Sequence, residues 1–498
     1  MGQPHTTILF SDAPSATASG LPPTVDHDAR VGVPAVVIPG APTQGEPRQL
    51  SALDVQLLDC ETDTAALHVG MLILLDSRNA PRGPLTADGL RRLFSDRLHL
   101  APALRWRLRT VPLGIDLPYW EDAETIDLGS HIREVHLPAG AGDVQLAEYV
   151  ERRHAEPLDR SRPLWECDLL TGLADGRQAV YAKVHHSVVD GMSAAEIMAA
   201  ILDVSADGTP RPLPADGIRR TRTPSAVEMV ARSVPNVLTR QVTRVGAVLQ
   251  AGSAILGIGS GVPTKHERVP FNGPSTANRS VAFVSLPLDA VKAIKAGIDG
   301  TVNDVVMALC TSAVRRWMLD HDVDVDTPLL AAIPVSVRTP EQFGTGGNRF
   351  SVMLSSLPIS EPNPHYRLKL LHDSLIRVKE RFAALPPALL EQISSLVPSV
   401  MHGVVTRALI RVAAPVLPLA NLIVSNIPGP QFPLYIEGIR VQRSYPVSTL
   451  VSIAGSLNIT VMSYDGHLDF GIVACSDDVP DVWDIAHYLE DALRELQM

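Results

Sequence analysis

The chain is too long to fold around one hydrophobic core. It has 498 residues, whereas single cores stop growing at roughly 250 to 300 residues and longer chains divide into domains. Hydrophobic residues make up 45% of the sequence and charged residues 19%. Such a chain can bury apolar surface instead of remaining disordered. The sequence therefore predicts a folded protein with two domains of similar size.

Changes in composition along the chain suggest where these domains begin and end. Residues 1–47 are rich in Pro, Gly, Ala, Thr and Ser without a periodic apolar pattern, which indicates a disordered leader. We predict an N-terminal domain over residues 48–205 and a C-terminal domain over residues 280–498. Between them, prolines and glycines cluster in a connector, residues 206–279, in which residues 224–258 have a helical pattern.

Both predicted domains mix helices with strands. Apolar residues alternate in some segments, as in half-buried strands, and recur with helical spacing in others. The predicted strands are residues 68–75, 178–184 and 281–286, and the predicted helices are residues 87–98, 144–154, 288–296, 302–319 and 367–382. The sequence thus predicts the α/β class.

The predicted helix over residues 367–382 is basic and amphipathic. Its apolar residues form one stripe, and arginines and lysines occupy many of the other positions. Such a stripe can lie on an anionic membrane or a lipid droplet. More often it faces a protein core, which is the interpretation that we favour.

The charge of the chain argues against a nucleic-acid partner. The formal net charge is −11, so a phosphate backbone would be repelled by the average field of the protein. We therefore expect no nucleic acid among its partners.

Cysteine usage and hydropathy indicate a cytoplasmic protein. Four cysteines, at positions 60, 167, 310 and 475, are far apart and form no CxxC pair, so we expect them to be reduced. Residues 2–19 lack the basic and apolar regions of a signal peptide. The most apolar stretch, residues 404–424, is interrupted by arginines and prolines, so we expect no transmembrane helix.

The run His185-His186-Ser187-Val188-Val189-Asp190-Gly191 lies where chemistry is expected. It follows the strand predicted over residues 178–184, and a helix is predicted from Ser193, which would cap it with Glu196 three residues later. Loops at strand ends hold catalytic side chains on rigid supports. Neighbouring strand residues point to opposite faces, so His185 and His186 cannot serve one site in the same way.

The side chains of this run suit proton transfer. A histidine can take a proton from an alcohol at neutral pH. Asp190 fits a turn-forming carboxylate, and Gly191 fits a position with positive φ. Taken alone, however, the pair is more often structural. A metal site is disfavoured because the two rings diverge and no CxxC or HExxH spacing is nearby, so no metal is predicted.

The HHxxxDG pattern resembles the signature of the coenzyme A-dependent acyltransferase superfamily, which includes chloramphenicol acetyltransferase and the condensation domains of peptide synthetases. Further runs, in order along the chain, are similar to the bacterial wax ester synthase/diacylglycerol acyltransferase family. These runs are PLDRSRPLWE from residue 157, FNGP from 271, TVNDVV from 301, PVSVR from 334, GNR from 347, SNIPGP from 425 and LNITVMSYDG from 457.

The resemblance implies a fold and a site. It implies two chloramphenicol-acetyltransferase-like mixed-sheet domains, joined by the helical connector, with an active-site tunnel between them. His186 would be the general base, supported by His185, Asp190 and Gly191. We expect Asp190 to pair with Arg338. Asn303 and Asp304, which either cap a helix or line the site, and Asn426 complete the candidate site.

The resemblance also implies a reaction. A long-chain fatty acyl group would pass from acyl-CoA, a substrate and not a cofactor, to diacylglycerol or to a long-chain alcohol, without a covalent acyl-enzyme. No cofactor is expected, and peripheral contact with a membrane or lipid droplet is compatible with such substrates. One alternative is transfer to a specialised lipid or polyketide alcohol. The other is a weakly catalytic paralogue on lipid droplets, which the intact HHxxxDG run disfavours.

Overall fold

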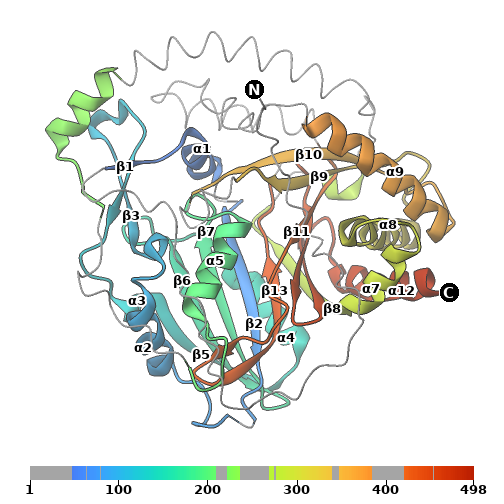
Figure 1. Ribbon diagram of the computed structural model, residues 1–498, viewed down its shortest axis with the longest axis horizontal. Helices are drawn as coiled ribbons and strands as arrows, with labels where there is room; N and C mark the ends of the chain where they lie inside the picture. The colour runs from blue at the N-terminus through green and yellow to red at the C-terminus, as the bar shows by residue number, and fades with distance from the viewer. Residues whose placement is uncertain are drawn as a thin grey trace, which may run out of the picture.

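The fold contains two six-stranded sheets. The computed structural model describes residues 47–62, 64–78, 80–208, 221–235, 269–273, 276–338, 347–383, 420–451 and 454–498. In Figure 1 the first sheet lies to the left and the second to the right. Both are mixed sheets packed against helices, which confirms the predicted class and the two mixed-sheet domains.

The first sheet is covered by helices on both faces. Its strands, in spatial order, are β12 (Tyr435–Ile436), β13 (Ile439–Val447), β2 (His68–Leu75), β7 (Gln178–His185), β6 (Trp165–Leu173) and β5 (Ile132–Ala141). Neighbours run antiparallel except β5 and β6. Successive strand residues point to opposite faces. Accordingly, Ile73 and Leu75 pack with α2 (Ala87–Arg97), whereas Leu72 and Leu74 pack with α4 (Asp143–Ala155).

Shorter elements surround this sheet. A small sheet is formed by β1 (Arg48–Gln49), β4 (Tyr119–Asp122) and β3 (Trp106–Arg109). The remaining helical elements of this part are α1 (Ala52–Cys60), η1 (Pro102–Arg105), η2 (Pro112–Gly114), α3 (Leu128–His131) and α5 (Gly191–Ile201).

Helices cover the outer face of the second sheet. Its strands, in spatial order, are β10 (Phe350–Leu357), β9 (Leu329–Ser336), β11 (Leu422–Ile427), β14 (Leu457–Tyr464), β15 (His467–Cys475) and β8 (Arg279–Pro287). Its core includes residues of α7 (Leu288–Ala296), α8 (Val302–Asp320), α9 (Pro364–Ala383) and α12 (Val482–Gln497). A short turn, η3 (Pro270–Asn272), precedes β8. β11 runs parallel to both β9 and β14.

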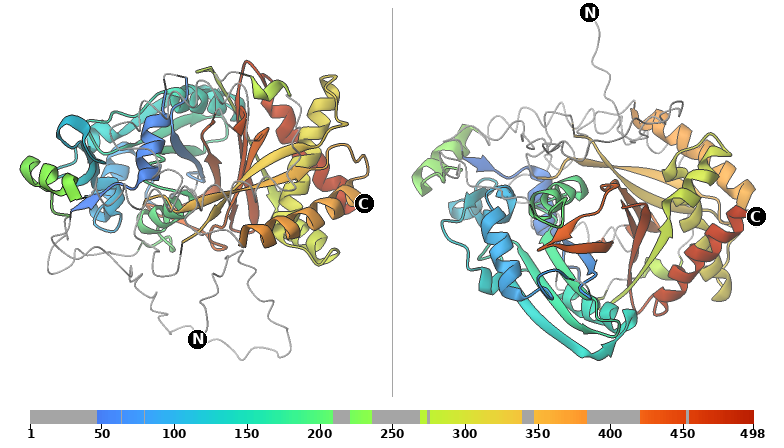
Figure 2. Two further views of the ribbon diagram at one scale, coloured as in Figure 1. Left: turned by 90° about the horizontal axis from the view of Figure 1, so that it is seen from above. Right: turned by 60° about the horizontal axis from the view of Figure 1, so that its bottom comes forward.

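A late segment of the chain belongs to the first sheet. β12 and β13 follow β11 in sequence, yet β13 pairs with β2 over Val441–Val447. Figure 2 shows these strands beside those of the first sheet. β13 also passes close to β15, where a Cβ atom on Gly471 would lie 1.7 Å from the backbone oxygen of Pro446. The first sheet is thus built from both halves of the chain.

The two halves share one hydrophobic cluster. α4 lies between the sheets, and its residues Leu146 and Val150 are buried together with Val281 and Val473 of the second sheet. The ring of Phe283 on β8 stacks on that of Tyr445 on β13, with centroids 4.7 Å apart. Because this apolar surface is removed from water only when the halves meet, their packing stabilises both.

The helix predicted over residues 367–382 lies within α9, and its stripe faces the core. Leu368, Leu371 and Leu375 are buried against the second sheet, and Val378 and Phe382 pack against the same cluster. The interpretation that the stripe faces a protein core is therefore confirmed. In the predicted connector, residues 226–235 are helical, and residues 236–258 of the predicted helix lie outside the described residues.

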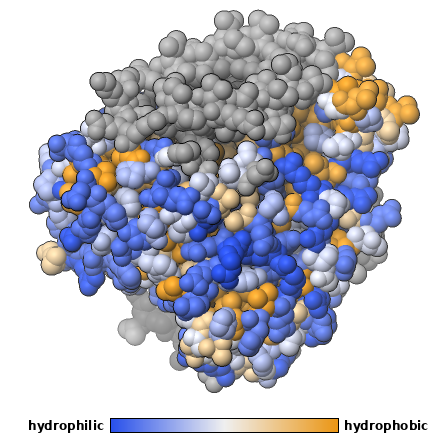
Figure 3. Space-filling view, turned by 180° about the vertical axis from the view of Figure 1, so that it is seen from behind, coloured by the Kyte–Doolittle hydropathy of each residue, from blue (hydrophilic) through white to orange (hydrophobic). Residues whose placement is uncertain are grey.

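Among the described residues, no helix has the length and apolar character needed to cross a membrane. Figure 3 shows hydrophilic side chains over much of one face, with hydrophobic ones in separate groups. All four cysteines are free, and those at positions 167, 310 and 475 are buried.

The close approach of β13 and β15 leads to a prediction. Gly471→Ala should lower the free energy of unfolding by at least about 2 kcal/mol, because the added methyl group meets a backbone oxygen that cannot move alone. Urea denaturation followed by circular dichroism would measure the change. Gly297→Ala is the control, since its φ of −72° suits alanine. Equal stability of the two variants would show that the strands do not meet as described.

Candidate active site

The loop from His185 to Gly191 connects β7 to α5. α5 begins three residues earlier than predicted, because Asp190 and not Ser193 is its N-cap: Asp190 Oδ1 accepts a hydrogen bond of 2.9 Å from the Ser193 backbone N–H. The prediction of positive φ at Gly191 was also wrong. Glycine suits this position for another reason, since a Cβ atom there would lie 3.2 Å from Ile427 Cδ1.

His185 is buried and holds the turn. Its Nδ1 accepts a 3.0 Å hydrogen bond from the Ser187 backbone N–H and lies 2.7 Å from Ser187 Oγ. In the neutral ring the proton is therefore on Nε2. Burial, assisted by the charge of Arg160, lowers the pKa of His185 to about 3. A ring that is neutral and enclosed in this way is a structural element of the loop.

His186 points to the opposite side and is half-buried. Its Nδ1 lies 3.0 Å from Asn348 Oδ1, and its ring centroid lies 5.6 Å from that of Phe350. Asn348 precedes β10 and Phe350 is its first residue; Figure 1 shows β10 reaching from the second sheet toward α1. No residue in the described ranges forms a hydrogen bond with His186 Nε2. This nitrogen is the one that can exchange a proton with a substrate.

Asp190 is held by donors on all sides. Its carboxylate accepts from Ser193 N–H, from Nε and Nη2 of Arg338 at 3.2 and 2.8 Å, and from Arg349 N–H at 3.0 Å. The predicted contact between Asp190 and Arg338 is thus confirmed. Three of these N–H donors converge on Oδ2, and that of Ser193 binds Oδ1. Asp190 is therefore the acceptor that joins the start of α5, Arg338 and the backbone at Arg349.

Arg338 fastens the loop to the second half of the chain. It lies just after β9, donates 2.8 Å to Ser193 Oγ, and also donates to the carbonyl oxygen of Gly347. Gly347 in turn donates 3.2 Å to the carbonyl oxygen of Val188. The histidine loop, the end of β9 and the start of β10 form one connected unit.

The other predicted residues lie at the N-terminus of α8 and the end of β11. Asp304 closes a capping box with Thr301 and also lies 2.8 Å from His372 Nδ1 on α9, so its capping role is confirmed. Asn303 is buried, and its Nδ2 has no hydrogen-bond partner among the described residues. Asn426 Nδ2 donates to Asn303 Oδ1 at 3.4 Å. Asn426 precedes Ile427, whose side chain lies close to Gly191, whereas Asp304 faces α9.

Two residues of the site were not predicted. Asn348 contacts His186. Its side-chain and backbone N–H groups also donate to Asp54 on α1, at 2.8 and 3.2 Å. Asn348 lies in the GNR run, but nothing in that run indicates its contact. Asp54 closes a capping box with Ser51, so its sequence pattern indicates only a helix start.

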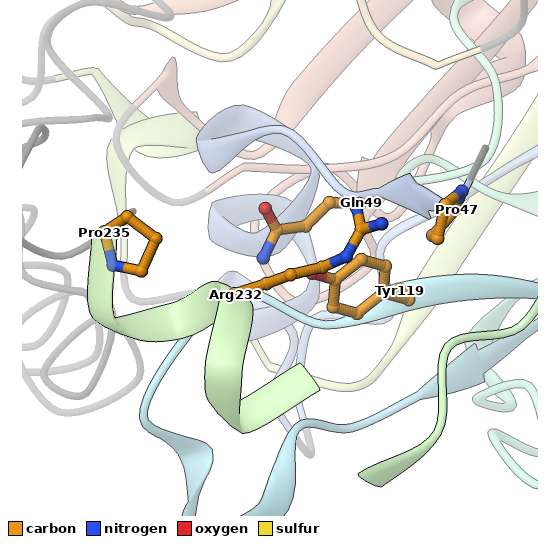
Figure 4. Close-up of a pocket in the computed structure, with 5 residues that line it drawn as sticks. All are labelled: Pro47, Gln49, Tyr119, Arg232 and Pro235. Atoms are coloured by element: carbon orange, nitrogen blue, oxygen red, sulfur yellow. The ribbon is translucent and has the colours of Figure 1, made fainter. Parts of the chain in front are cut away.

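A separate hollow lies away from the histidine loop. It measures about 240 Å³ and is lined by Pro47, Gln49, Tyr119, Arg232 and Pro235. Figure 4 shows these side chains between β1, β4 and the helix of residues 226–235. It contains none of the predicted site residues, and its lining offers no histidine or carboxylate for proton transfer.

Comparisons with known proteins identify the family. The wax ester synthase/diacylglycerol acyltransferase catalytic domain matches residues 50–306, and the C-terminal domain of the same family matches residues 346–497. The chain belongs to the wax ester synthase/diacylglycerol acyltransferase family. It is therefore an acyltransferase.

The relatives agree with this assignment. A Mycobacterium tuberculosis protein that carries the name diacylglycerol O-acyltransferase is 34% identical over 468 residues, covering 92% of each chain. The wax ester synthase/diacylglycerol acyltransferase from Marinobacter aquaeolei VT8 has a TM-score of 0.66 at 28% identity, over 90% of this chain and 98% of its own. The first condensation domain of the calcium-dependent antibiotic synthetase shares the fold, with a TM-score of 0.55 at 17% identity over 91% and 96%.

The buried neutral His185 leads to a pH prediction. The unfolded chain binds a proton at His185 as the pH falls through about 6.5, whereas the folded chain does so only near pH 3. The stability that depends on a neutral His185 is thus present above pH 6.5 and is lost as the pH falls. His185→Asn removes this dependence and leaves an oxygen that can accept from Ser187.

The stability advantage of the natural chain over His185→Asn should therefore shrink by about 2 kcal/mol between pH 6.5 and pH 5. Urea unfolding at several pH values measures this difference. Buried carboxyl groups such as Asp469, whose pKa is raised by burial, stabilise both proteins as the pH falls. This effect is the same in the two proteins and cancels in the difference. A difference that stays constant across this range would contradict the buried, neutral state of His185.

Proposed function

We propose that the protein transfers a long-chain fatty acyl group from acyl-CoA to the hydroxyl of diacylglycerol, and also to long-chain alcohols, with His186 as general base. The observation that carries this proposal is the state of His186. Its Nδ1 is engaged by Asn348, its Nε2 has no hydrogen-bond partner in the described part of the chain, and it lies at the junction of the two halves of a family acyltransferase.

In the proposed reaction, one proton passes through His186 while the acyl group moves from sulfur to oxygen. His186 Nε2 takes the proton from the acceptor hydroxyl while the hydroxyl oxygen attacks the thioester carbonyl carbon. A C–O bond forms, and the carbonyl electrons move onto oxygen. When the tetrahedral intermediate collapses, the C–S bond breaks, and the coenzyme A sulfur leaves with the electron pair of that bond. The proton on Nε2 passes to this sulfur, which yields the ester and coenzyme A thiol and restores His186.

The surrounding residues have supporting roles in this proposal. His185, Asp190 and Gly191 shape the loop, and Arg338 holds Asp190 in place. Asn303 and Asn426 line the substrate path. In support, Asn303 Nδ2 is a buried donor without a partner among the described residues, and the side chain of Ile427, next to Asn426, lies 3.2 Å from where a Cβ atom on Gly191 would be. A long acyl chain gains about 0.8 kcal/mol per buried CH₂, so we propose an apolar tunnel between the halves.

The acceptor is tested directly with purified protein. Labelled palmitoyl-CoA is supplied with either diolein or hexadecanol, and the esters are separated and counted. We expect product with diolein and a smaller amount with hexadecanol. His186→Ala should lower the rate by about 10²- to 10⁴-fold, the usual contribution of a general base, while its circular dichroism spectrum stays unchanged. His372→Ala is the matched control, since His372 lies on α9 and contacts Asp304.

Different results separate the alternatives. Full activity of His186→Ala would show that His186 is not the general base. Folded protein that esterifies neither acceptor would favour a specialised lipid alcohol as substrate or a weakly catalytic protein on lipid droplets. Contact with a membrane or lipid droplet is a separate proposal, supported only by the insolubility of the substrates.

A further inference from the structure

Asn348 lies between α1 and the histidine loop, and its side chain has three partners. Its Oδ1 lies 3.0 Å from His186 Nδ1. Its Nδ2 donates 2.8 Å to Asp54 Oδ1 and 2.5 Å to the backbone carbonyl oxygen of His186. Asn348 is 5% exposed, so few water molecules can substitute for these partners.

The orientation of the Asn348 amide follows from these partners. An amide group has two N–H donors on nitrogen and an oxygen that only accepts. Asp54 Oδ1 and the His186 carbonyl oxygen are both acceptors, so each requires one N–H of Nδ2. With the amide turned over, its oxygen would face both acceptors, and buried groups would lose their hydrogen bonds. The oxygen of Asn348 therefore faces His186.

The orientation of the amide decides where the proton of the His186 ring lies. Oδ1 of Asn348 cannot donate, so the hydrogen bond at 3.0 Å requires a proton on Nδ1 of His186. In the neutral ring, Nε2 then carries a lone pair and no proton. His185 is held in the other tautomer, with its proton on Nε2, because its Nδ1 accepts from Ser187 N–H. Two adjacent histidines are thus held as different tautomers by different hydrogen bonds.

Asp54 fixes Asn348 in turn. Its Oδ1 accepts from both the backbone and the side-chain N–H of Asn348, and its Oδ2 accepts 3.2 Å from Ser51 N–H. All of these neighbours donate, and their hydrogen bonds oppose the effect of burial, which raises the pKa of the Asp54 carboxyl group. Asp54 is 5% exposed, so its bonds with Asn348 are shielded from water.

We infer that Asn348 is a positioning residue that, oriented by Asp54, holds His186 in the tautomer with the proton on Nδ1 and Nε2 free. This inference rests on the proposed role of His186 as base. Asp54 and His186 belong to the first half of the chain, whereas Asn348 precedes β10 of the second. The base is therefore prepared for proton transfer only when the two halves are assembled.

The tautomer is measured by nitrogen NMR on full-length protein labelled with ¹⁵N-histidine. The His186 signals are assigned as those lost in His186→Ala. We expect the natural protein to show a protonated Nδ1 and an unprotonated Nε2 at a pH where the ring is neutral. In Asn348→Ala, and in Asp54→Ala, part or all of this population should move to the tautomer protonated on Nε2.

Kinetics with acyl-CoA and an acceptor provide the second readout. Both variants should lower kcat by roughly 10- to 100-fold, as loss of an orienting partner does at other sites, while KM changes little. Thr86→Ala is the control: it removes the N-cap hydrogen bond of α2, a helix whose buried residues belong to a different hydrophobic cluster from those of α1. It should lower the thermal midpoint while leaving kcat and the His186 tautomer unchanged.

The results of these experiments test this inference and the proposed function separately. A natural protein whose His186 carries its proton on Nε2 would overturn the inference, whatever the variants do. So would unchanged kcat and tautomer in folded Asn348→Ala, even if His186→Ala is inactive. Full activity of His186→Ala would instead show that His186 is not the general base. The NMR measurement would still decide whether Asn348 determines the tautomer of the His186 ring.

Discussion

The site depends on the buried ion pair between Asp190 and Arg338. Removing two charges from water is costly, and the cost is offset only when geometry and further hydrogen bonds satisfy both groups. Here two N–H groups of Arg338 and the backbone N–H groups of Ser193 and Arg349 satisfy the carboxylate. The same arginine binds Ser193 Oγ and the Gly347 carbonyl. One pair thus fixes the helix start, the histidine loop and the segment that carries Asn348.

The packing of the two halves makes this geometry rigid. β13 completes the first sheet from the C-terminal half, and α4 is buried between the sheets. Because interiors are close-packed, small displacements of one half are resisted by the other. His186 and Asn348, which are 162 residues apart in sequence, are therefore held 3.0 Å apart. This distance is that of a hydrogen bond, which restrains rotation of the His186 ring.

Local patterns allowed much of the fold to be predicted. Residues 68–75 and 288–296 were predicted with the bounds of β2 and α7, since their apolar periodicity is strong. The position of β13 in the first sheet was not foreseen, because cross-strand pairing between distant segments leaves no local signal. The cap of α5 was misplaced because Ser193 and Glu196 resemble a capping box, whereas the Asp190 carboxylate reaches Ser193 N–H. The contact of Asp190 with Arg338 was predicted, but Asp54 and Asn348 were missed, since their roles depend on three segments meeting.

The energy with which the Asp190–Arg338 pair joins the histidine loop to the second half can be measured with a double-mutant cycle. Asp190→Asn, Arg338→Met and the double variant are unfolded in urea. Each single change should cost about 3 to 5 kcal/mol because it leaves a buried polar group without its partner. The double change should cost less than their sum by about 2 to 3 kcal/mol. Costs that add to within about 0.5 kcal/mol would show that the two side chains do not interact.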